Sequence, residues 1–277
     1  MQTVTLPSGE KVPALGMGTW MLGDNRTRRT EEIATLQRGI DLGMTLIDTA
    51  EMYGEGASER LGRGANGGRG AEVFLGSEVY PHNAGGCALM SACERSLQRL
   101  GVDCLDLYLL HWRGQFPLSE TIEGFEKLRA QGKIRHWGVS HLDPDDMEEL
   151  HTQPGGNAVA TNQVLYNLTR RGIEWDLLPW CQQRKIPLMA YSPIEQARLL
   201  SHPGLCKLAT RLGMQPATLA LAWLLQREDV IVIPRTSNRP HLEENHAALE
   251  IRLDAASLAE LDRLFPPPDC AVPLEVL

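Results

Sequence analysis

The sequence predicts an α/β protein: a closed (β/α)8 TIM barrel with an N-terminal β-hairpin and an extra C-terminal helix. Short apolar segments alternate with helical patterns along the chain, and eight of them follow the hairpin. An open doubly wound sheet typically uses about five or six strands, so the count favours a barrel. No change in composition and no Gly/Ser-rich linker divides the chain, which predicts a single domain of residues 1–277.

The strands are predicted from apolar runs between turn signals. Thr3–Leu6 and Lys11–Pro13 flank a Pro-Ser-Gly-Glu turn and form the expected hairpin. Leu105–Leu110 is nearly all apolar, as expected of a strand that is covered on both faces. The other expected barrel strands are 15–19, 45–48, 73–77, 137–140, 158–164, 186–191 and 230–233.

Cap residues and a 3.6-residue periodicity predict the helices between these strands. Thr30 and Ser119 stand before helical patterns and are the expected N-caps of two helices. Asp143 precedes a proline at the first position of another helix, which is typical of a helix start. Further helices are expected near 58–62, 89–100, 174–183, 216–226, 240–249 and 257–264, and the glycine-rich segment 62–70 is expected to be a loop.

The composition disfavours several classes of function. The chain has 27 Lys and Arg against 35 Asp and Glu, a formal net charge of −8, and no basic run. Such a chain is a poor partner for nucleic acid or for an anionic membrane surface. No stretch approaches about 18 apolar residues and no signal-peptide pattern opens the chain, so we expect a cytoplasmic protein, acting as a monomer. The six cysteines have no metal-ligand spacing, and we expect no metal.

Polar residues stand where the predicted strands end, and in a (β/α)8 barrel the active site lies at the carboxyl ends of the strands. Taken singly, Asp48 is as well explained as a helix cap, and His111 as a buried core histidine. Tyr53 alone would more often be a surface residue. Their shared position at one rim favours an active site. The polar residues at the strand ends are Thr19, Asp48, Glu78, His111, Ser140, Gln163, Tyr191 and Arg235.

Six motifs, in order along the chain, resemble those of the aldo-keto reductases. They are LIDTAEMYG (46–54), LDLYLLHW (105–112), GVSH (138–141), TNQVLYN (161–167), AYSPI (190–194) and IPRTSNRPHLEEN (233–245), preceded by the hairpin and GMGTW. The resemblance covers nearly the whole chain. It implies a barrel that binds NADPH without a Rossmann fold and reduces aldehydes or ketones to alcohols without a metal.

The resemblance also implies roles for four residues of the reacting centre. Tyr53 matches the proton donor to the carbonyl oxygen, and His111 matches the residue that hydrogen-bonds this oxygen. Asp48 matches the partner of a lysine that tunes the tyrosine, but this chain has Glu78 in the position of that lysine. A lysine there would lower the pKa of the tyrosine, and a carboxylate would act in the opposite sense. We therefore expect weakened reductase activity.

Further matches concern the cofactor and the substrate. Ser140 and Gln163 fall where the family holds the nicotinamide carboxamide, His141 stands in the position of an asparagine, and Tyr191 matches the aromatic residue that stacks on the nicotinamide. The cofactor contacts implied in the strand ends and their loops also include Gly18, Thr19, Trp20, Asp48, Ser192 and Ile194. The substrate pocket implied by the resemblance is formed by Trp20, Tyr53, His111 and Trp112, and it suits small carbonyl compounds.

The segment after the last barrel strand is expected to bind the phosphorylated end of the cofactor. Free N–H groups at a helix start and a fixed cation, Arg235, converge there. The resemblance implies that the 2′-phosphate and the adenine are contacted by Arg235, Thr236, His241, Glu244 and Asn245. Because His241 replaces a permanent cation with a titratable one, the preference for NADPH over NADH should be modest, with NADH bound at lower affinity.

Two alternatives remain open on the sequence. The barrel could bind NADPH with little or no turnover, as a variant or a sensor. It could also be a lyase or isomerase that uses Glu78 and Asp48 as a carboxyl pair. Cofactor binding and NADPH consumption separate the three hypotheses.

Overall fold

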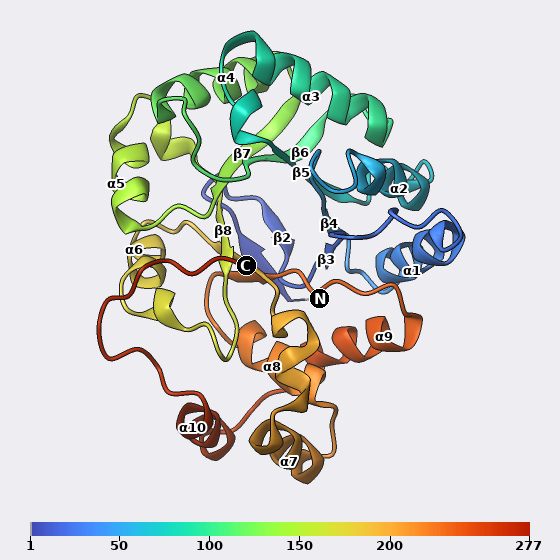
Figure 1. The fold of residues 1–277 in the computed structure, drawn as a ribbon, viewed down its shortest axis with the longest axis vertical. Coiled ribbons are helices and arrows are strands. Elements are labelled where there is room, and N and C mark those ends of the chain that lie inside the picture. Colours follow the sequence, from blue (N-terminus) through green and yellow to red (C-terminus); the bar gives the residue numbers. More distant parts are fainter. Residues whose placement is uncertain (1) are drawn as a thin grey trace.

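A computed structural model describes residues 2–277. Eight parallel strands surround the centre of the molecule, and the helices form an outer ring (Figure 1). The strands pair in chain order, and the first is joined to the last because Leu15 pairs with Val232 and Gly18 N donates to Pro234 O over 3.0 Å. The barrel strands are β3 (Met17–Gly18), β4 (Leu46–Asp48), β5 (Phe74–Val79), β6 (Leu105–Leu110), β7 (Ile134–Ser140), β8 (Asn162–Leu165), β9 (Leu188–Tyr191) and β10 (Val230–Val232).

The opening hairpin consists of β1 (Thr3–Thr5) and β2 (Lys11–Pro13), which pair antiparallel as predicted. Glu10 in its turn accepts hydrogen bonds from Arg135 and contacts His136, both at the beginning of β7. The hairpin therefore lies at the amino ends of the barrel strands, opposite the end where the candidate site is expected.

The ring of helices follows the predicted alternation. Its members are α1 (Arg29–Asp41), α2 (Ala57–Asn66), α3 (Gly86–Leu100), α4 (Leu118–Ala130), α5 (Pro144–Thr152), α6 (Leu177–Gln183), α7 (Pro203–Leu212), α8 (Pro216–Leu225), α9 (Arg239–Ala247) and the extra α10 (Ala255–Leu264). Short 3₁₀ turns occupy Pro81–Asn83, Gly156–Ala158, Gly172–Glu174, Glu195–Ser201 and Ala248–Glu250. The sequence did not predict α7.

Two of the predicted caps are wrong. α1 begins at Arg29 and α4 at Leu118, so Thr30 and Ser119 lie inside the first turns instead of before them. Leu118 is buried, and its packing against the barrel sets the start of α4 two residues earlier than the cap pattern indicates. The cap at Asp143 is confirmed, because its carboxylate accepts a hydrogen bond from Asp146 N over 2.8 Å.

The glycine-rich segment 62–70 is only partly a loop. α2 continues through Gly64, where a Cβ would lie 2.6 Å from Cδ1 of Ile33, so this glycine allows α1 and α2 to approach closely. The helix ends at Asn66, and Gly67 directly after it adopts φ +50°, a left-handed conformation that glycine favours. Tertiary packing thus converts half of a predicted loop into helix.

Several other boundaries also differ from the prediction; β7, for example, begins at Ile134, three residues before the predicted start at 137. A 3₁₀ turn occupies the start of the segment predicted as strand 158–164, and β8 begins only at Asn162. The helix predicted at 174–183 begins at Leu177, after a cap at Asp176. In the described part of the chain, no helix is both long and apolar enough to cross a membrane.

Candidate active site

The carboxyl ends of five neighbouring strands bring polar side chains to one rim of the barrel. Asp48 ends β4, Glu78 lies near the end of β5, His111 directly follows β6, Ser140 ends β7, and Gln163 pairs with Ser140 from β8. Gln163 Nε2 donates to Asp48 Oδ1 over 3.0 Å, which links residues 115 positions apart. The structure therefore gathers these residues as the rim argument predicts.

Tyr53 reaches the same rim from the loop after β4. Its ring meets that of His111 edge to face, with centroids 5.8 Å apart at 84°. Nε2 of His111 lies 3.3 Å from Oε2 of Glu78, whereas Nδ1 is buried without a hydrogen-bond partner among the described residues. Burial, with a smaller contribution from the charge of His141, lowers the pKa of His111 to about 3. The imidazole is therefore neutral at neutral pH.

Glu78 is fully buried, and neither carboxyl oxygen has a hydrogen-bond partner among residues 2–277. Burial, and then the charge of Asp48, raises the pKa of Glu78 well above its usual range. Burial also raises the pKa of Asp48 to about 7, against the opposing effect of the Gln163 hydrogen bond. Glu78 thus removes the cation of the family pattern, and its raised pKa favours the protonated, uncharged form of the carboxyl.

Tyr53 has a pKa raised well above the usual value for a tyrosine. Burial is the main cause, followed by the charges that Glu78 and Asp48 carry when they ionise. The hydroxyl therefore keeps its proton at every physiological pH, and forming a tyrosinate here is costly.

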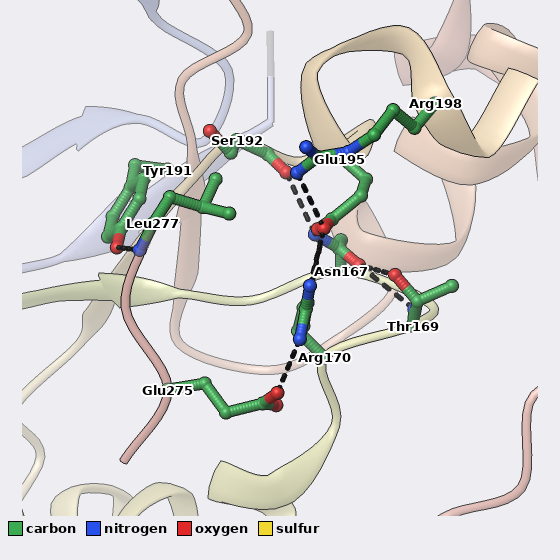
Figure 2. Close-up of polar contacts among 9 residues, drawn as sticks. All are labelled: Asn167, Thr169, Arg170, Tyr191, Ser192, Glu195, Arg198, Glu275 and Leu277. Carbon is green, nitrogen blue, oxygen red and sulfur yellow. Dashed lines mark hydrogen bonds and ion pairs between the residues drawn. The ribbon is translucent and has the colours of Figure 1, made fainter.

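His141 uses both ring nitrogens inside the protein. Nδ1 lies 2.9 Å from the carbonyl oxygen of His111, which can only accept, so Nδ1 donates. Burial lowers the pKa of His141, and in the neutral ring Nε2 then accepts from the Tyr191 hydroxyl, 2.9 Å away. The backbone N–H of Leu277 approaches the same hydroxyl at 3.4 Å (Figure 2). His141, which stands where the resemblance implies a contact with the nicotinamide carboxamide, thus holds the Tyr191 hydroxyl in place.

Arg235 joins the loop after β10 to the loop after β3. Its Nε donates to Trp20 O over 3.0 Å, and its Nη2 approaches Met21 O at 3.4 Å. The cap of α9 is Asn238, whose side chain accepts from the backbone N–H of His241 over 3.1 Å. The His241 side chain itself is exposed.

The other predicted site residues occupy the surroundings of this rim. Thr19 is buried and its hydroxyl donates to Asp48 O over 2.9 Å. Trp20 and Trp112 are 43% and 38% exposed, as expected of residues at an open mouth. Of the remaining predicted contacts, Gly18 lies in β3, Ser192 and Ile194 in the loop after β9, Thr236 before α9, and Glu244 and Asn245 on α9.

Sequence reasoning missed a polar cluster beside this rim, shown in Figure 2. Glu195, after β9, accepts from Arg170 and Asn167 over 2.8 Å each and from Arg198 over 3.0 Å. Arg170 also binds Glu275 of the C-terminal tail at 2.5 Å. We call these five residues the Glu195 cluster. Its members come from three distant segments, so no local motif indicates it. Within the described residues, no group of three or more His, Cys, Asp or Glu could hold a metal ion.

The rim of Asp48, Tyr53 and His111 is a buried site that can hold and donate a proton, and comparison with known proteins identifies the family. The family model "Aldo/keto reductase family" matches residues 14–265. The chain belongs to the aldo/keto reductase family, which confirms the resemblance and the barrel fold. It is 49% identical over 271 residues to methylglyoxal reductase YeaE of Escherichia coli K12, covering 96% of this chain and 95% of that protein.

Two more relatives extend this comparison. Glyoxal reductase of Bacillus subtilis is 31% identical over 264 residues, covering 95% of this chain and 92% of the relative. A crystal structure of an aldo/keto reductase from Klebsiella pneumoniae in complex with NADP and acetate has a TM-score of 0.97 and 48% identity, covering 99% of each chain.

Proposed function

We propose that this chain reduces aldehydes and ketones to alcohols with NADPH, and that small 1,2-dicarbonyl compounds such as methylglyoxal and glyoxal are its substrate class. The observation that carries the proposal is the edge-to-face packing of the Tyr53 ring against the ring of neutral His111 at the carboxyl ends of the barrel strands. The names of the relatives, a methylglyoxal reductase and a glyoxal reductase, support the substrate class. The exposed Trp20 and Trp112 suit an open mouth that admits small substrates.

The residues present suit the cofactor. The Tyr191 hydroxyl is anchored by His141, which fixes the orientation of a half-buried aromatic ring at the rim. Arg235 holds the junction of two loops and offers a permanent cation for a phosphate. NADP and NADPH occupy the Klebsiella relatives, which are 48% identical to this chain.

The chain's own residues handle the proton. Bound NADPH supplies a hydride to the carbonyl carbon. Tyr53 donates its proton to the carbonyl oxygen and recovers one from water afterwards, and the neutral imidazole of His111 hydrogen-bonds this oxygen. No metal takes part in this scheme.

Glu78 weakens this chemistry. A lysine at this position would stabilise the tyrosinate left after proton donation, whereas a buried carboxyl does not. Removal of one electrostatic stabiliser of developing charge typically lowers kcat by a factor on the order of 10²–10³. We therefore infer slow turnover with nearly intact cofactor binding.

The test measures quenching of protein fluorescence by NADPH and consumption of NADPH with methylglyoxal. The proposal is supported if the protein binds NADPH and consumes it slowly, and if Tyr53→Phe abolishes the consumption but not the binding. Binding without turnover for any small aldehyde would identify a cofactor-binding barrel instead. Absence of binding would favour a carboxylate-based lyase or isomerase.

We further infer that residues 1–277 fold as one unit and act as a cytoplasmic monomer, with neither nucleic acid nor a membrane as partner. The net charge of −8 without a basic run supports the absence of a nucleic-acid or membrane partner. Sedimentation and a single unfolding transition test the monomer and the single domain. A dimer at micromolar concentration would contradict the monomer, and two separate unfolding transitions would contradict the single domain.

A further inference from the structure

We propose that Arg28, together with Arg235, recognises the 2′-phosphate of NADPH, so that Arg28 and not His241 is the second cation that selects the phosphorylated cofactor. The inference rests on the proposed function, because it assumes that the cofactor lies across the loop between β10 and α9. No motif places Arg28 in the site, since it stands in a polar segment before α1.

Arg28 reaches the loop that carries Arg235. Its Nη2 donates to the hydroxyl of Ser237 over 2.8 Å, which joins residues 209 positions apart. Ser237 is only 8% exposed, and Thr35 of α1 donates to its carbonyl oxygen over 3.2 Å. In Figure 1, α1 and α9 are neighbours in the outer ring, as their packing requires. The guanidinium of Arg28, which precedes α1, is thus held against the loop between β10 and α9.

The two loops exchange arginines. Arg235 binds the backbone of Trp20 and Met21 in the loop after β3, while Arg28 binds Ser237 in the loop after β10. This crossing brings both guanidinium groups to one junction. Burial is the main reason why the pKa of Arg235 is lowered. The charge of Arg28 lowers this pKa further, which indicates that the two guanidinium groups are close enough to repel each other.

The carboxylates around this pair of cations form no close ion pair with either guanidinium in residues 2–277. Glu31 lies 4.0 Å from Nε of Arg28, and both side chains are well exposed, so their attraction is weak. Glu32 and Asp24 raise the pKa of Arg235, and Glu32 does so by more than the charge of Arg28 lowers it. The Glu32 carboxylate also accepts a hydrogen bond from the backbone N–H of Gly23 at 2.9 Å. Within residues 2–277, no Asp or Glu oxygen lies within ion-pair distance of Arg235.

A phosphate monoester fits this junction better than a neutral ribose does. Arginine presents planar, permanently charged donors that match phosphate oxygens, whereas a neutral histidine does not. The His241 side chain is exposed and its backbone serves the cap of α9. Selection by two arginines also predicts that the preference for NADPH is nearly independent of pH between about 6 and 8, unlike selection by a histidine.

The test compares dissociation constants for NADPH and NADH, measured by fluorescence quenching. Arg28→Ala should weaken NADPH binding about tenfold or more, as expected for loss of a charge-assisted hydrogen bond, and change NADH binding less than about twofold. Arg28→Lys should lie between the wild type and Arg28→Ala. The matched control is Arg26→Ala, an exposed arginine of the same loop that has no hydrogen-bond or ion-pair partner among the described residues, and it should leave both constants unchanged.

The outcomes separate this inference from the proposed function. If Arg235→Ala abolishes the preference for NADPH and Arg28→Ala leaves it intact, the inference fails and the function stands. Equal weakening of both cofactors by Arg28→Ala, at an unchanged Tm, also overturns it and makes Arg28 a loop-positioning residue. If the wild type binds neither cofactor, the proposed function fails, and the inference with it.

Discussion

Two buried glutamates at the same end of the barrel have pKa values that are shifted in opposite directions. Glu78 is fully buried with no hydrogen-bond partner in the described residues, and its pKa is raised well above the usual range, mainly by burial. Glu195 is 6% exposed, yet the hydrogen bonds of Arg170, Asn167 and Arg198 outweigh burial and lower its pKa. The comparison teaches that the supply of donors, and not burial alone, decides whether an interior carboxyl is charged.

The backbone around the two residues differs as well. Glu78 lies in regular β5. Around Glu195, four residues adopt positive φ angles without being glycine: Ser192 at 46°, Glu195 at 52°, Gln196 at 53° and Ala197 at 69°. Such conformations typically cost about 1–3 kcal/mol each and persist only where surrounding contacts hold them. The hydrogen bonds of the Glu195 cluster hold this strained loop, which carries two of the predicted cofactor contacts.

The largest expected effect is that of placing a cation at position 78. Glu78→Lys should raise kcat/KM for methylglyoxal by about 10²–10³, because a cation beside Tyr53 stabilises the developing tyrosinate. Steady-state kinetics with NADPH measure this, and fluorescence quenching should show little change in NADPH affinity. Glu78→Gln is the control for loss of the carboxyl and should stay close to the wild type at neutral pH. A lower rate in Glu78→Lys would show that Glu78 itself is the working acid.

The second prediction concerns the pH dependence of stability. Glu78 and Asp48 hold protons in the folded state that the unfolded chain releases above about pH 4, so the folded state binds more protons and stability falls as pH rises. For Asp48 this loss ends near pH 7. Glu78→Gln should flatten the curve by about 1.4 kcal/mol per pH unit and stabilise the protein at about pH 8. Urea unfolding at several pH values measures it. Parallel curves for the two proteins would refute the raised pKa of Glu78.

The same substitution at the other glutamate should have the opposite sign. Glu195→Gln keeps an acceptor for Asn167 but loses the three charge-assisted hydrogen bonds from Arg170 and Arg198, and it should lower the free energy of unfolding by about 1–2 kcal/mol. The magnitude is at the low end because Arg170 and Arg198 are 33% and 58% exposed. Urea unfolding at about pH 8, beside Glu78→Gln, tests the contrast directly. Stabilisation by both substitutions would contradict it.

The smallest expected effect is on the pH profile of turnover. Between about pH 6 and 8 Asp48 loses its proton, and its negative charge makes a tyrosinate at Tyr53 costlier. We expect kcat to fall several-fold over this range, by less than about tenfold. In Glu78→Lys the fall should be smaller, since a cation offsets the charge of Asp48. A wild-type profile that rises with pH would contradict this coupling.

Much of the fold could be predicted because the signals are local. The strand Leu105–Leu110 matches the structure at both ends, since its apolar run and flanking turns leave no alternative. Asp143 was identified as a cap by its own neighbours. The predictions at Thr30 and at Gly62–Gly70 went wrong where contacts from other elements outweighed local preference, as at Gly64 against Ile33.

The candidate site divides in the same way. The rim residues could be predicted from the sequence, because the apolar runs show where each strand ends. Parallel strands in a barrel end on the same side, so these residues had to meet. The Glu195 cluster, the crossing of Arg28 and Arg235, and the anchoring of Tyr191 by His141 could not, because each joins segments far apart in the chain. The residue order shows that a carboxyl stands at position 78, but only the folded chain raises its pKa. Its ionisation depends on desolvation and on the distance to donors, and these exist only once the barrel has closed around it.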